Sequence, residues 1–268
     1  MNKGLAPRTA LFLPASNPRA IAKVRSLDAD LVILDLEDAV RDDAKAEARA
    51  AAVAAVAEGF GSRVAAIRIN GEGTAEHDAD ITAVAASAAD MVVLPKVESA
   101  HAAARVATAT GKPVLAMVET PAGVLAAATI ASASGVAGLI AGTNDLRAAL
   151  RIPPSAGREG LSVALQTIVL AARAGGRWAL DGVFNALDDE EALAAECREG
   201  RSFGFDGKTL IHPNQIAPAN AAFGPSEAEV ADARALVAAA TGGAERFAGR
   251  MVEAMHVAQA RALLERAP

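Results

Sequence analysis

The stretch "VLAMVETPAGV", Val114 to Val124, places a carboxylate directly after an apolar run. Five apolar residues precede Glu119, and Thr120 and Pro121 follow it. A continuous apolar run is typical of a strand that is buried on both faces, as in a parallel sheet. Pro121 restricts the backbone and removes an N–H donor. We therefore expect a buried strand that ends on Glu119.

Similar runs recur along the 268 residues. Between them lie Ala-rich segments with helical periodicity, such as 45–59 and 159–176, which end in Gly before the next strand. This alternation predicts parallel strands joined by crossover helices. The eight candidate strands are 9–15, 30–38, 64–70, 90–96, 113–119, 138–142, 178–183 and 204–211.

The eight units predict an α/β fold, a (β/α)8 TIM barrel over residues 1–222, with a doubly wound open sheet as the rival. Polar residues gather at the carboxyl ends of the strands, where either fold keeps its chemistry: "DLED", "RIN", "PKVE", "VETP", "GTND" and "DGKTLIHP". Residues 223–268 fall outside the repeat. Helices over 226–241 and 251–267 are expected to form a lid or an oligomer contact there.

Composition limits the classes of partner. Hydrophobic residues make up 52% of the chain and aromatic residues 3%, so the core must consist mainly of Ala, Val, Leu and Ile. A net charge of -6 argues against a nucleic-acid surface. No segment has the pattern of a signal peptide or a membrane helix, and the single Cys197 allows no internal disulfide. We expect a cytoplasmic protein without a membrane partner.

Glu119 and Asp145 stand at the ends of two neighbouring predicted strands. Two unpaired carboxylates that converge in a partly dry pocket favour a bound cation. Since the donors are oxygens only, Mg²⁺ or Mn²⁺ is the natural choice. The alternative is that Asp145 is a helix N-cap or first-turn acid and that Glu119 pairs with Lys or Arg.

Arg68 ends the third predicted strand in "AIRIN". It is either a structural ion-pair partner or a functional group that clamps a carboxylate bidentately or stabilises an oxyanion. Asp35, Glu37 and Asp38 are too dense a group of acids for a core strand. We expect Glu37 or Asp38 to orient metal-bound water or Arg68, or to pair with Lys96.

Lys208 and His212 lie in "GFDGKTLIHP", at the end of the eighth predicted strand. Lys208 is a candidate for binding an anionic cofactor, or else a barrel residue that pairs with Asp181 or Asp206. His212 is a catalytic candidate, or else a partner of a backbone carbonyl. The sequence contains no GxSxG, P-loop or GxGxxG motif.

The chain resembles the citrate lyase β-subunit family of the HpcH/HpaI aldolase superfamily, which includes malyl-CoA and citramalyl-CoA lyases. The resemblance runs nearly end to end, through "LFLPASNPRAIAKV", "VILDLEDAV", "IRINGEGT", "VVLPKVES", "MVETPAGV", "GTNDL", "REGL", "DGVFNALDD", "GFDGKTLIHPNQI" and "NAAFGPS". It implies a Mg²⁺-dependent barrel, often trimeric. Such an enzyme makes or breaks a carbon–carbon bond between a 2-oxo acid and the acyl methyl group of a coenzyme A thioester.

The resemblance also implies roles for particular residues. Glu119 and Asp145 become the metal ligands, and Arg68 becomes the residue that holds the oxo acid and the developing oxyanion. The backbone of Thr120 to Gly123, which includes Pro121 and Ala122, becomes the receiver of the substrate carboxylate. Glu37 remains a catalytic candidate, and Lys208 and His212 remain candidate substrate contacts.

One departure from the family concerns the acid that protonates the enolate. Relatives usually carry Asp in a C-terminal block supplied by a neighbouring subunit, whereas this chain reads "GRMVEAMHV", with Glu253 for Asp and Met255 for Pro. Two alternatives to a free CoA-ester lyase remain: a citrate lyase β subunit that acts on a carrier-protein thioester, and a weakly catalytic barrel that binds metal and CoA. The sequence does not select the 2-oxo acid.

Overall fold

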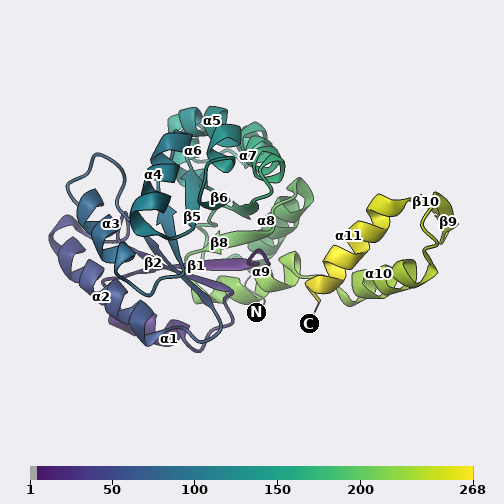
Figure 1. The fold of residues 1–268 in the computed structure, drawn as a ribbon, viewed down its shortest axis with the longest axis horizontal. Coiled ribbons are helices and arrows are strands. Elements are labelled where there is room, and N and C mark those ends of the chain that lie inside the picture. Colours follow the sequence, from purple (N-terminus) through teal and green to yellow (C-terminus); the bar gives the residue numbers. More distant parts are fainter. Residues whose placement is uncertain (1–4, 268) are drawn as a thin grey trace.

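The computed structural model describes residues 5–267 and shows a closed barrel of eight parallel strands (Figure 1). Each strand pairs with the next, and β8 pairs with β1. The eight predicted strands and the TIM barrel are confirmed, and the open sheet is excluded. The strands are β1 (Thr9–Pro14), β2 (Leu31–Asp35), β3 (Val64–Arg68), β4 (Met91–Leu94), β5 (Val114–Val118), β6 (Val136–Ala141), β7 (Trp178–Asp181) and β8 (Gly207–Leu210).

Helices follow the strands and surround the barrel (Figure 1). The helices predicted over 45–59 and 159–176 are present, the second as a 3-10 turn followed by α7. The helices are α1 (Pro18–Val24), α2 (Lys45–Glu58), α3 (His77–Ala85), α4 (Ala100–Thr110), α5 (Pro121–Ala131), α6 (Thr143–Ala149), α7 (Ser162–Ala174), α8 (Glu190–Phe203) and α9 (Ile216–Phe223). Short 3-10 turns are η1 (Asp42–Ala44), η2 (Glu159–Leu161) and η3 (Pro213–Gln215).

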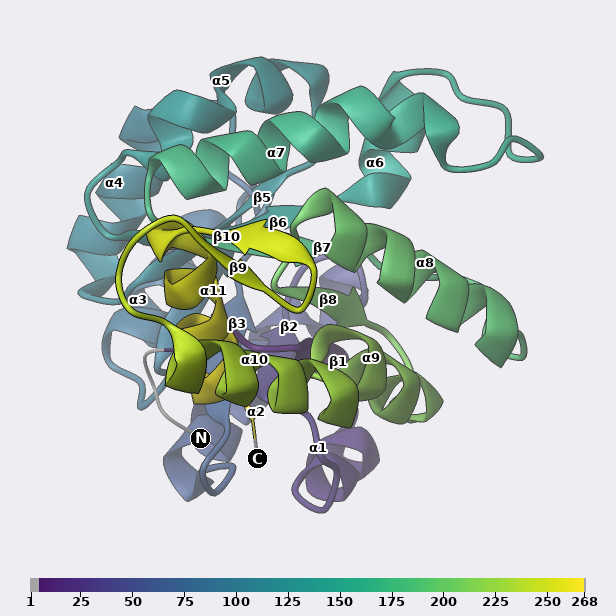
Figure 2. The ribbon, with the colours of Figure 1, turned by 90° about the vertical axis from the view of Figure 1, so that its right-hand side faces the viewer.

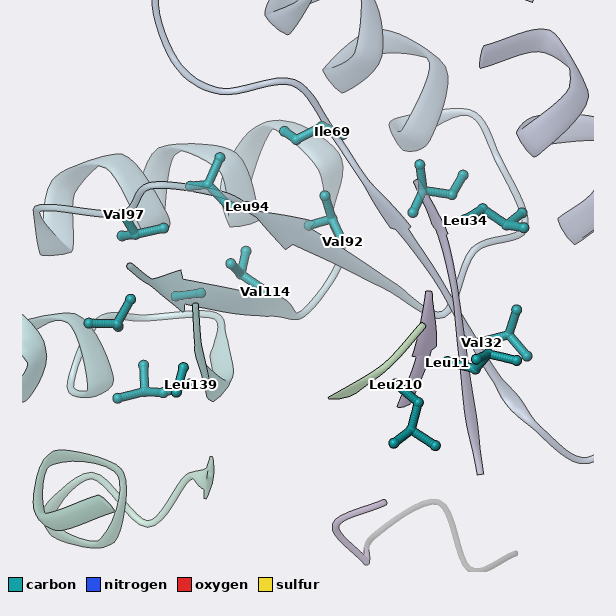
Figure 3. Packing of buried hydrophobic residues seen from close by; sticks show 14 of the residues in the cluster. Leu11, Val32, Leu34, Ile69, Val92, Leu94, Val97, Val114, Leu139 and Leu210 are labelled. Atoms are coloured by element: carbon teal, nitrogen blue, oxygen red, sulfur yellow. The ribbon is translucent and has the colours of Figure 1, made fainter. Parts of the chain in front are cut away.

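The strands carry two separate apolar layers, because successive residues of a strand point to opposite faces. Leu31 and Ile33 of β2 belong to a cluster of strand residues that fills the barrel interior. Val32 and Leu34 belong to a larger cluster, shared with the helices, of which Figure 3 shows a part. Residues that continue the inward set past the end of a strand therefore point into the barrel mouth.

The C-terminal extension forms a small unit beyond the barrel (Figures 1 and 2). It consists of α10 (Glu227–Ala239), a hairpin of β9 (Glu245–Phe247) and β10 (Arg250–Val252), and α11 (Ala254–Glu265). The prediction of a helix over 251–267 is wrong at its start, because Arg250–Val252 pairs with β9. Ala248 and Gly249, both with positive φ, form the turn between these strands.

The extension has a core of its own, built from Ala233, Leu236, Val252 and Ala260. Phe223, by contrast, belongs to the barrel core, so the barrel reaches one residue further than the predicted boundary at 222. Within residues 5–267, no helix combines the length and the apolar character that a membrane span needs.

Candidate functional site

A cavity of about 350 Å³ opens at the carboxyl ends of the barrel strands. Arg68, Glu119 and Asp145, predicted separately from the sequence, all line it. Most of the remaining wall is apolar. It includes Phe12, Leu13, Pro14, Ala39, Met117, Ala141, Val183 and Ile211, with Asp35, Asp38, Gly142, Thr143, Asn144 and Thr209. The barrel thus gathers the candidate residues in one small, mainly apolar space.

Glu119 follows β5 and continues its inward set, after Leu115 and Met117. The residue is 4% exposed, and its Oε1 accepts a hydrogen bond from the backbone N–H of Lys96 at 2.7 Å. Burial raises the pKa of Glu119 to about 7; the Lys96 hydrogen bond opposes this, and the charges of Glu37 and Asp145 add to it. The site therefore favours a proton or a cation at this carboxylate.

Asp145 lies in the first turn of α6, while Gly142 is the N-cap of that helix. Of the alternative expected for Asp145, a helix N-cap or a first-turn acid, the N-cap role is therefore wrong and the first-turn position is confirmed. Among residues 5–267, the carboxylate of Asp145 forms no ion pair, and that of Glu119 is not paired with a Lys or Arg side chain. The pairing expected as the alternative for Glu119 is thus absent from the described structure, and both carboxylates remain available.

The two carboxylates fit a hard divalent cation. Mg²⁺ is commonly held by one or two carboxylates and completes its shell with water and substrate oxygens. The described residues contain no group of three or more His, Cys, Asp or Glu side chains that could hold a metal ion. Glu119 and Asp145 could thus supply two protein ligands, and the cavity leaves room for water or substrate.

Arg68 ends β3 with its guanidinium group buried in the cavity wall. Its Nε donates to Asp35 Oδ1 at 2.6 Å, and its Nη2 donates to Asp35 Oδ2 at 2.5 Å. Burial alone lowers the pKa of Arg68, but the hydrogen bonds and charge of Asp35 outweigh this and raise it. The Nε/Nη2 edge of Arg68, one of the edges that can clamp a carboxylate bidentately, thus holds Asp35. A substrate can meet only the N–H groups that remain.

Glu37 links Arg68 to Lys96. Its Oε2 lies 2.8 Å from Arg68 Nη1, and its Oε1 accepts from Lys96 Nζ at 2.9 Å. The predicted contact with Arg68 and the predicted pairing with Lys96 therefore occur together. Asp38 is more remote, since its carboxylate is 63% exposed and lies 3.5 Å from Arg68.

Lys208 does not line the cavity, and its assignment to substrate binding is corrected here. Its side chain is 0% exposed, and Nζ donates to Asp181 at 2.9 Å and to Glu196 at 2.7 Å. Glu196 lies on α8, so Lys208 points outward from β8, while the next residue, Thr209, lines the cavity. The alternative as a barrel ion-pair residue is confirmed.

His212 and the Thr120 segment also lie outside the lining of the cavity. His212 caps the turn η3, and its Nδ1 accepts from the Asn214 N–H at 3.3 Å, so its partner is not the carbonyl that was expected. Thr120 caps α5: its Oγ1 accepts from the Gly123 N–H at 3.0 Å. That N–H is therefore already used, while Pro121 and Ala122 are exposed at the surface.

Among the cavity residues that were not singled out from the sequence, Phe12 and Gly142 pack directly on the candidate groups. The ring of Phe12 stacks on Arg68, with 5.0 Å between the ring centre and the guanidinium carbon. Gly142 packs on Glu119, where a Cβ would lie 2.2 Å from the Glu119 Cβ. Phe12 lies two residues after Ala10 on the same inward face of β1, and Gly142 directly follows β6, so both positions could have been found from the strand pattern.

Comparison with known proteins agrees with this geometry. Residues 8–213 match the family described as HpcH/HpaI aldolase/citrate lyase, and residues 160–268 match a carbon–carbon bond lyase family of the TIM-barrel fold. The (3S)-malyl-CoA thioesterase of Cereibacter sphaeroides is 42% identical, over 97% of this chain and 94% of the relative. A citrate lyase subunit beta-like protein of Mycobacterium tuberculosis is 39% identical, over 100% and 98%.

A solved structure covers nearly the same length. The crystal structure of CitE from Mycobacterium tuberculosis in complex with magnesium, acetoacetate and coenzyme A aligns with a TM-score of 0.84 and 37% identity. The alignment covers 98% of each chain. On the family match and on this similarity, the chain belongs to the HpcH/HpaI aldolase/citrate lyase family.

Proposed function

We propose that this protein is a Mg²⁺-dependent carbon–carbon lyase or condensing enzyme that acts on a 3-hydroxyacyl-CoA thioester. Substrates of the malyl-CoA, citramalyl-CoA or citryl-CoA type would give acetyl-CoA, or a similar acyl-CoA, and a 2-oxo acid. The observation that carries the proposal is the pair of unpaired carboxylates, Glu119 and Asp145, beside Arg68 in one cavity. The magnesium and coenzyme A bound by the related CitE support it.

The residues of the cavity suit the charge changes of this reaction. The hydroxyl loses its proton and becomes a carbonyl, the bond between the second and third carbons of the acyl chain breaks, and the electron pair passes into the thioester enolate. The second carbon then takes up a proton, so the reaction consumes no net proton. Mg²⁺ or Mn²⁺, when bound, would polarise the oxygen on the third carbon. Arg68 donates an N–H to the same oxygen or to the neighbouring carboxylate. Glu37 holds Arg68 in place, and the apolar wall excludes water from the enolate.

A second function is favoured by one relative. The Cereibacter sphaeroides protein is a (3S)-malyl-CoA thioesterase, which implies cleavage of the thioester rather than of the carbon chain. The same cavity suits that reaction, because a cation and Arg68 also stabilise a tetrahedral oxyanion. The lyase remains our first proposal, since the carbon–carbon bond lyase family covers residues 160–268.

The products distinguish these functions. Purified protein is incubated with malyl-CoA, citramalyl-CoA or citryl-CoA, with and without Mg²⁺, and the products are separated by chromatography with mass detection. A lyase releases acetyl-CoA and a 2-oxo acid, whereas a thioesterase releases free CoA and the hydroxy acid. A subunit of a citrate lyase complex acts only on a carrier-protein thioester. Absence of acetyl-CoA from all three esters would overturn the lyase proposal for free CoA substrates.

Protons should compete with Mg²⁺ for the site, because the pKa of Glu119 is raised from 4.5 to about 7. A protonated carboxyl group binds no cation, so the apparent Mg²⁺ affinity should rise up to about pH 7 and then level off. In the metal-free protein, the free energy of unfolding should fall over the same interval, since the folded state holds this proton more tightly than the unfolded chain.

Calorimetric titration with Mg²⁺ and thermal unfolding, each across this pH range, measure the two effects. Added Mg²⁺ should restore the stability that the metal-free protein loses as the pH rises. Equal Mg²⁺ affinity at about pH 5.5 and about pH 8 would contradict the raised pKa of Glu119.

A further inference from the structure

Lys96 follows β4 and Pro95 in a backbone conformation that L side chains rarely adopt. Its φ is 51°, in the left-handed region, and Lys lacks the short polar side chain that helps Asn and Asp to adopt it. Surrounding contacts must hold such a residue in place. One of them comes from the next residue, because the Val97 N–H donates to the Met117 carbonyl of β5 at 3.0 Å. The turn after β4 is thus attached to β5, two residues before Glu119.

In this conformation one residue presents two donors to two different acids. The backbone N–H of Lys96 donates to Glu119 Oε1 at 2.7 Å. Its side-chain Nζ donates to Glu37 Oε1 at 2.9 Å. Lys96 itself does not line the cavity, and its side chain is 47% exposed. It therefore acts on the site through its neighbours rather than by contact with a substrate.

The contact with Glu37 extends to Arg68. The carboxylate of Glu37 is 9% exposed and lies between two cations, with Oε2 2.8 Å from Arg68 Nη1. The other edge of Arg68 is held by Asp35. Lys96 is consequently the one link, in the described contacts, that joins the carboxylate of Glu119 to the cluster that orients Arg68.

We propose that Lys96 is a positioning residue, whose backbone N–H orients Glu119 and whose ammonium group orients Glu37 and, through it, Arg68. Fixing one oxygen of Glu119 leaves Oε2 for a cation, and fixing Glu37 determines where the remaining N–H groups of Arg68 point. A single residue, Lys96, then fixes the position of Glu119 relative to Arg68. This inference rests on the proposed function, because it takes Glu119 as a metal ligand and Arg68 as a substrate contact.

The side-chain half of the proposal is tested with Lys96→Met, which keeps the backbone N–H and an unbranched side chain one atom shorter than that of Lys, but removes the charge. With Mg²⁺ present, kcat/KM should fall by about 10- to 100-fold, the range for groups that orient metal-site residues. The Kd of pyruvate, used as the 2-oxo acid probe in calorimetry, should rise by about tenfold because Arg68 is less well oriented. The Kd of Mn²⁺ should change by less than about threefold, since the N–H to Glu119 is kept.

Two further variants separate positioning from a general effect on the fold. Lys96→Arg keeps a cation beside Glu37 and should recover most of the pyruvate affinity. Lys112→Met is the matched control: Lys112 precedes β5 at the opposite end of the barrel, and its Nζ donates to the Ser87 carbonyl at 2.9 Å. It should behave like the wild type. If Lys96→Met does not fold, Lys96→Gln, which keeps an N–H donor without the charge, replaces it in the same measurements.

The proposal is overturned if Lys96→Met leaves both kcat/KM and the pyruvate Kd within about twofold of the wild type. It is also overturned if Lys96→Arg loses as much as Lys96→Met, or if Mg²⁺ does not strengthen pyruvate binding to the wild type. A wild-type protein that binds pyruvate with Mg²⁺ but cleaves no ester overturns only the proposed function, because the pyruvate titrations still measure the effect of Lys96.

Discussion

Replacing Glu119 with glutamine is expected to lower kcat for Mg²⁺-dependent cleavage by about a thousandfold or more. The substitution keeps the shape of the side chain, and its amide oxygen can still accept the Lys96 N–H that now donates at 2.7 Å. It removes one of the two carboxylate charges that the site offers to a hard cation, and a neutral amide oxygen is a weaker ligand for Mg²⁺ or Mn²⁺. The Kd of Mn²⁺, measured by calorimetry, should therefore rise by at least about tenfold.

The same variant should be at least as stable as the wild type without metal. Burial raises the pKa of Glu119 to about 7, so above that pH the wild type holds a buried carboxylate that disfavours the folded state. A neutral amide removes that cost. An equal or higher melting temperature would show that the loss of activity is not unfolding. Normal Mn²⁺ affinity in Glu119→Gln would falsify the assignment of Glu119 as a metal ligand.

The matched control is Glu72→Gln. Glu72 is a carboxylate on the loop after β3, 54% exposed and 3.3 Å from Arg105, and it does not line the candidate cavity. This variant should keep wild-type activity. Asp145→Asn should resemble Glu119→Gln, and the double variant should lose little more than either single one, because two ligands of one ion act as a unit.

The fold could be predicted because local patterns and global architecture agree along most of the chain. Each strand run is bounded by Gly, Pro or polar residues, and each Ala-rich segment between strands is long enough for a crossover helix. Closure of the sheet into a barrel has no such local signal. It depends on pairing between β1 and β8, where Thr9 lies opposite Lys208, and these residues are far apart in the sequence.

The cavity residues could be predicted for the same reason, since a barrel brings the carboxyl ends of all its strands together. Their partners could not. Asp35, Glu37 and Asp38 stand within four positions, and only the three-dimensional structure shows that Asp35 takes the Nε edge of Arg68. The left-handed backbone of Lys96 has no sequence signal, because Lys is not a residue that favours positive φ.

The alternation of inward and outward residues along β8 bears on the role of Lys208. Inward residues alternate with outward ones, so Lys208 and Thr209 cannot both face the barrel interior. The choice between them follows from the register, in which Lys208 lies beside Asp181 of β7. The hairpin of the extension was missed because its strands have only three residues each, too few for a clear alternation.

If Glu253 is the acid that protonates the enolate, it should act in the cavity of a neighbouring subunit. The end of α11 is attached to the barrel by Arg266, whose Nη2 donates to the Asp206 carbonyl at 2.9 Å. Asp206 directly precedes β8, so this contact lies at the amino end of the strands, opposite the cavity. Glu253 is exposed at the other end of α11, which has 12 residues and is therefore about 18 Å long. It does not line the cavity of its own subunit.

An acid that completes a neighbour's site makes the oligomer, for which we propose a trimer, the working unit. Glu253→Gln should lower kcat by about a hundredfold or more, as expected for loss of a general acid, without weakening Mn²⁺ binding. Arg68→Ala should also be nearly inactive. Subunits of the two variants, co-expressed with different tags and purified as mixed oligomers, should regain activity, because an intact cavity of one can meet an intact Glu253 of the other.

When the two variants mix at random and in equal amounts in a ring, half of the cavities keep Arg68. Half of those cavities face a subunit that keeps Glu253, so about a quarter of wild-type activity should return. The control is a mixture of Arg68→Ala with Glu119→Gln. Both of these changes damage the same cavity, so no pairing of subunits restores a complete one, and activity should stay near that of the single variants. Equal activity in the two mixtures would mean that Glu253 does not act across a subunit interface, and wild-type activity in Glu253→Gln alone would mean that the proton comes from another group.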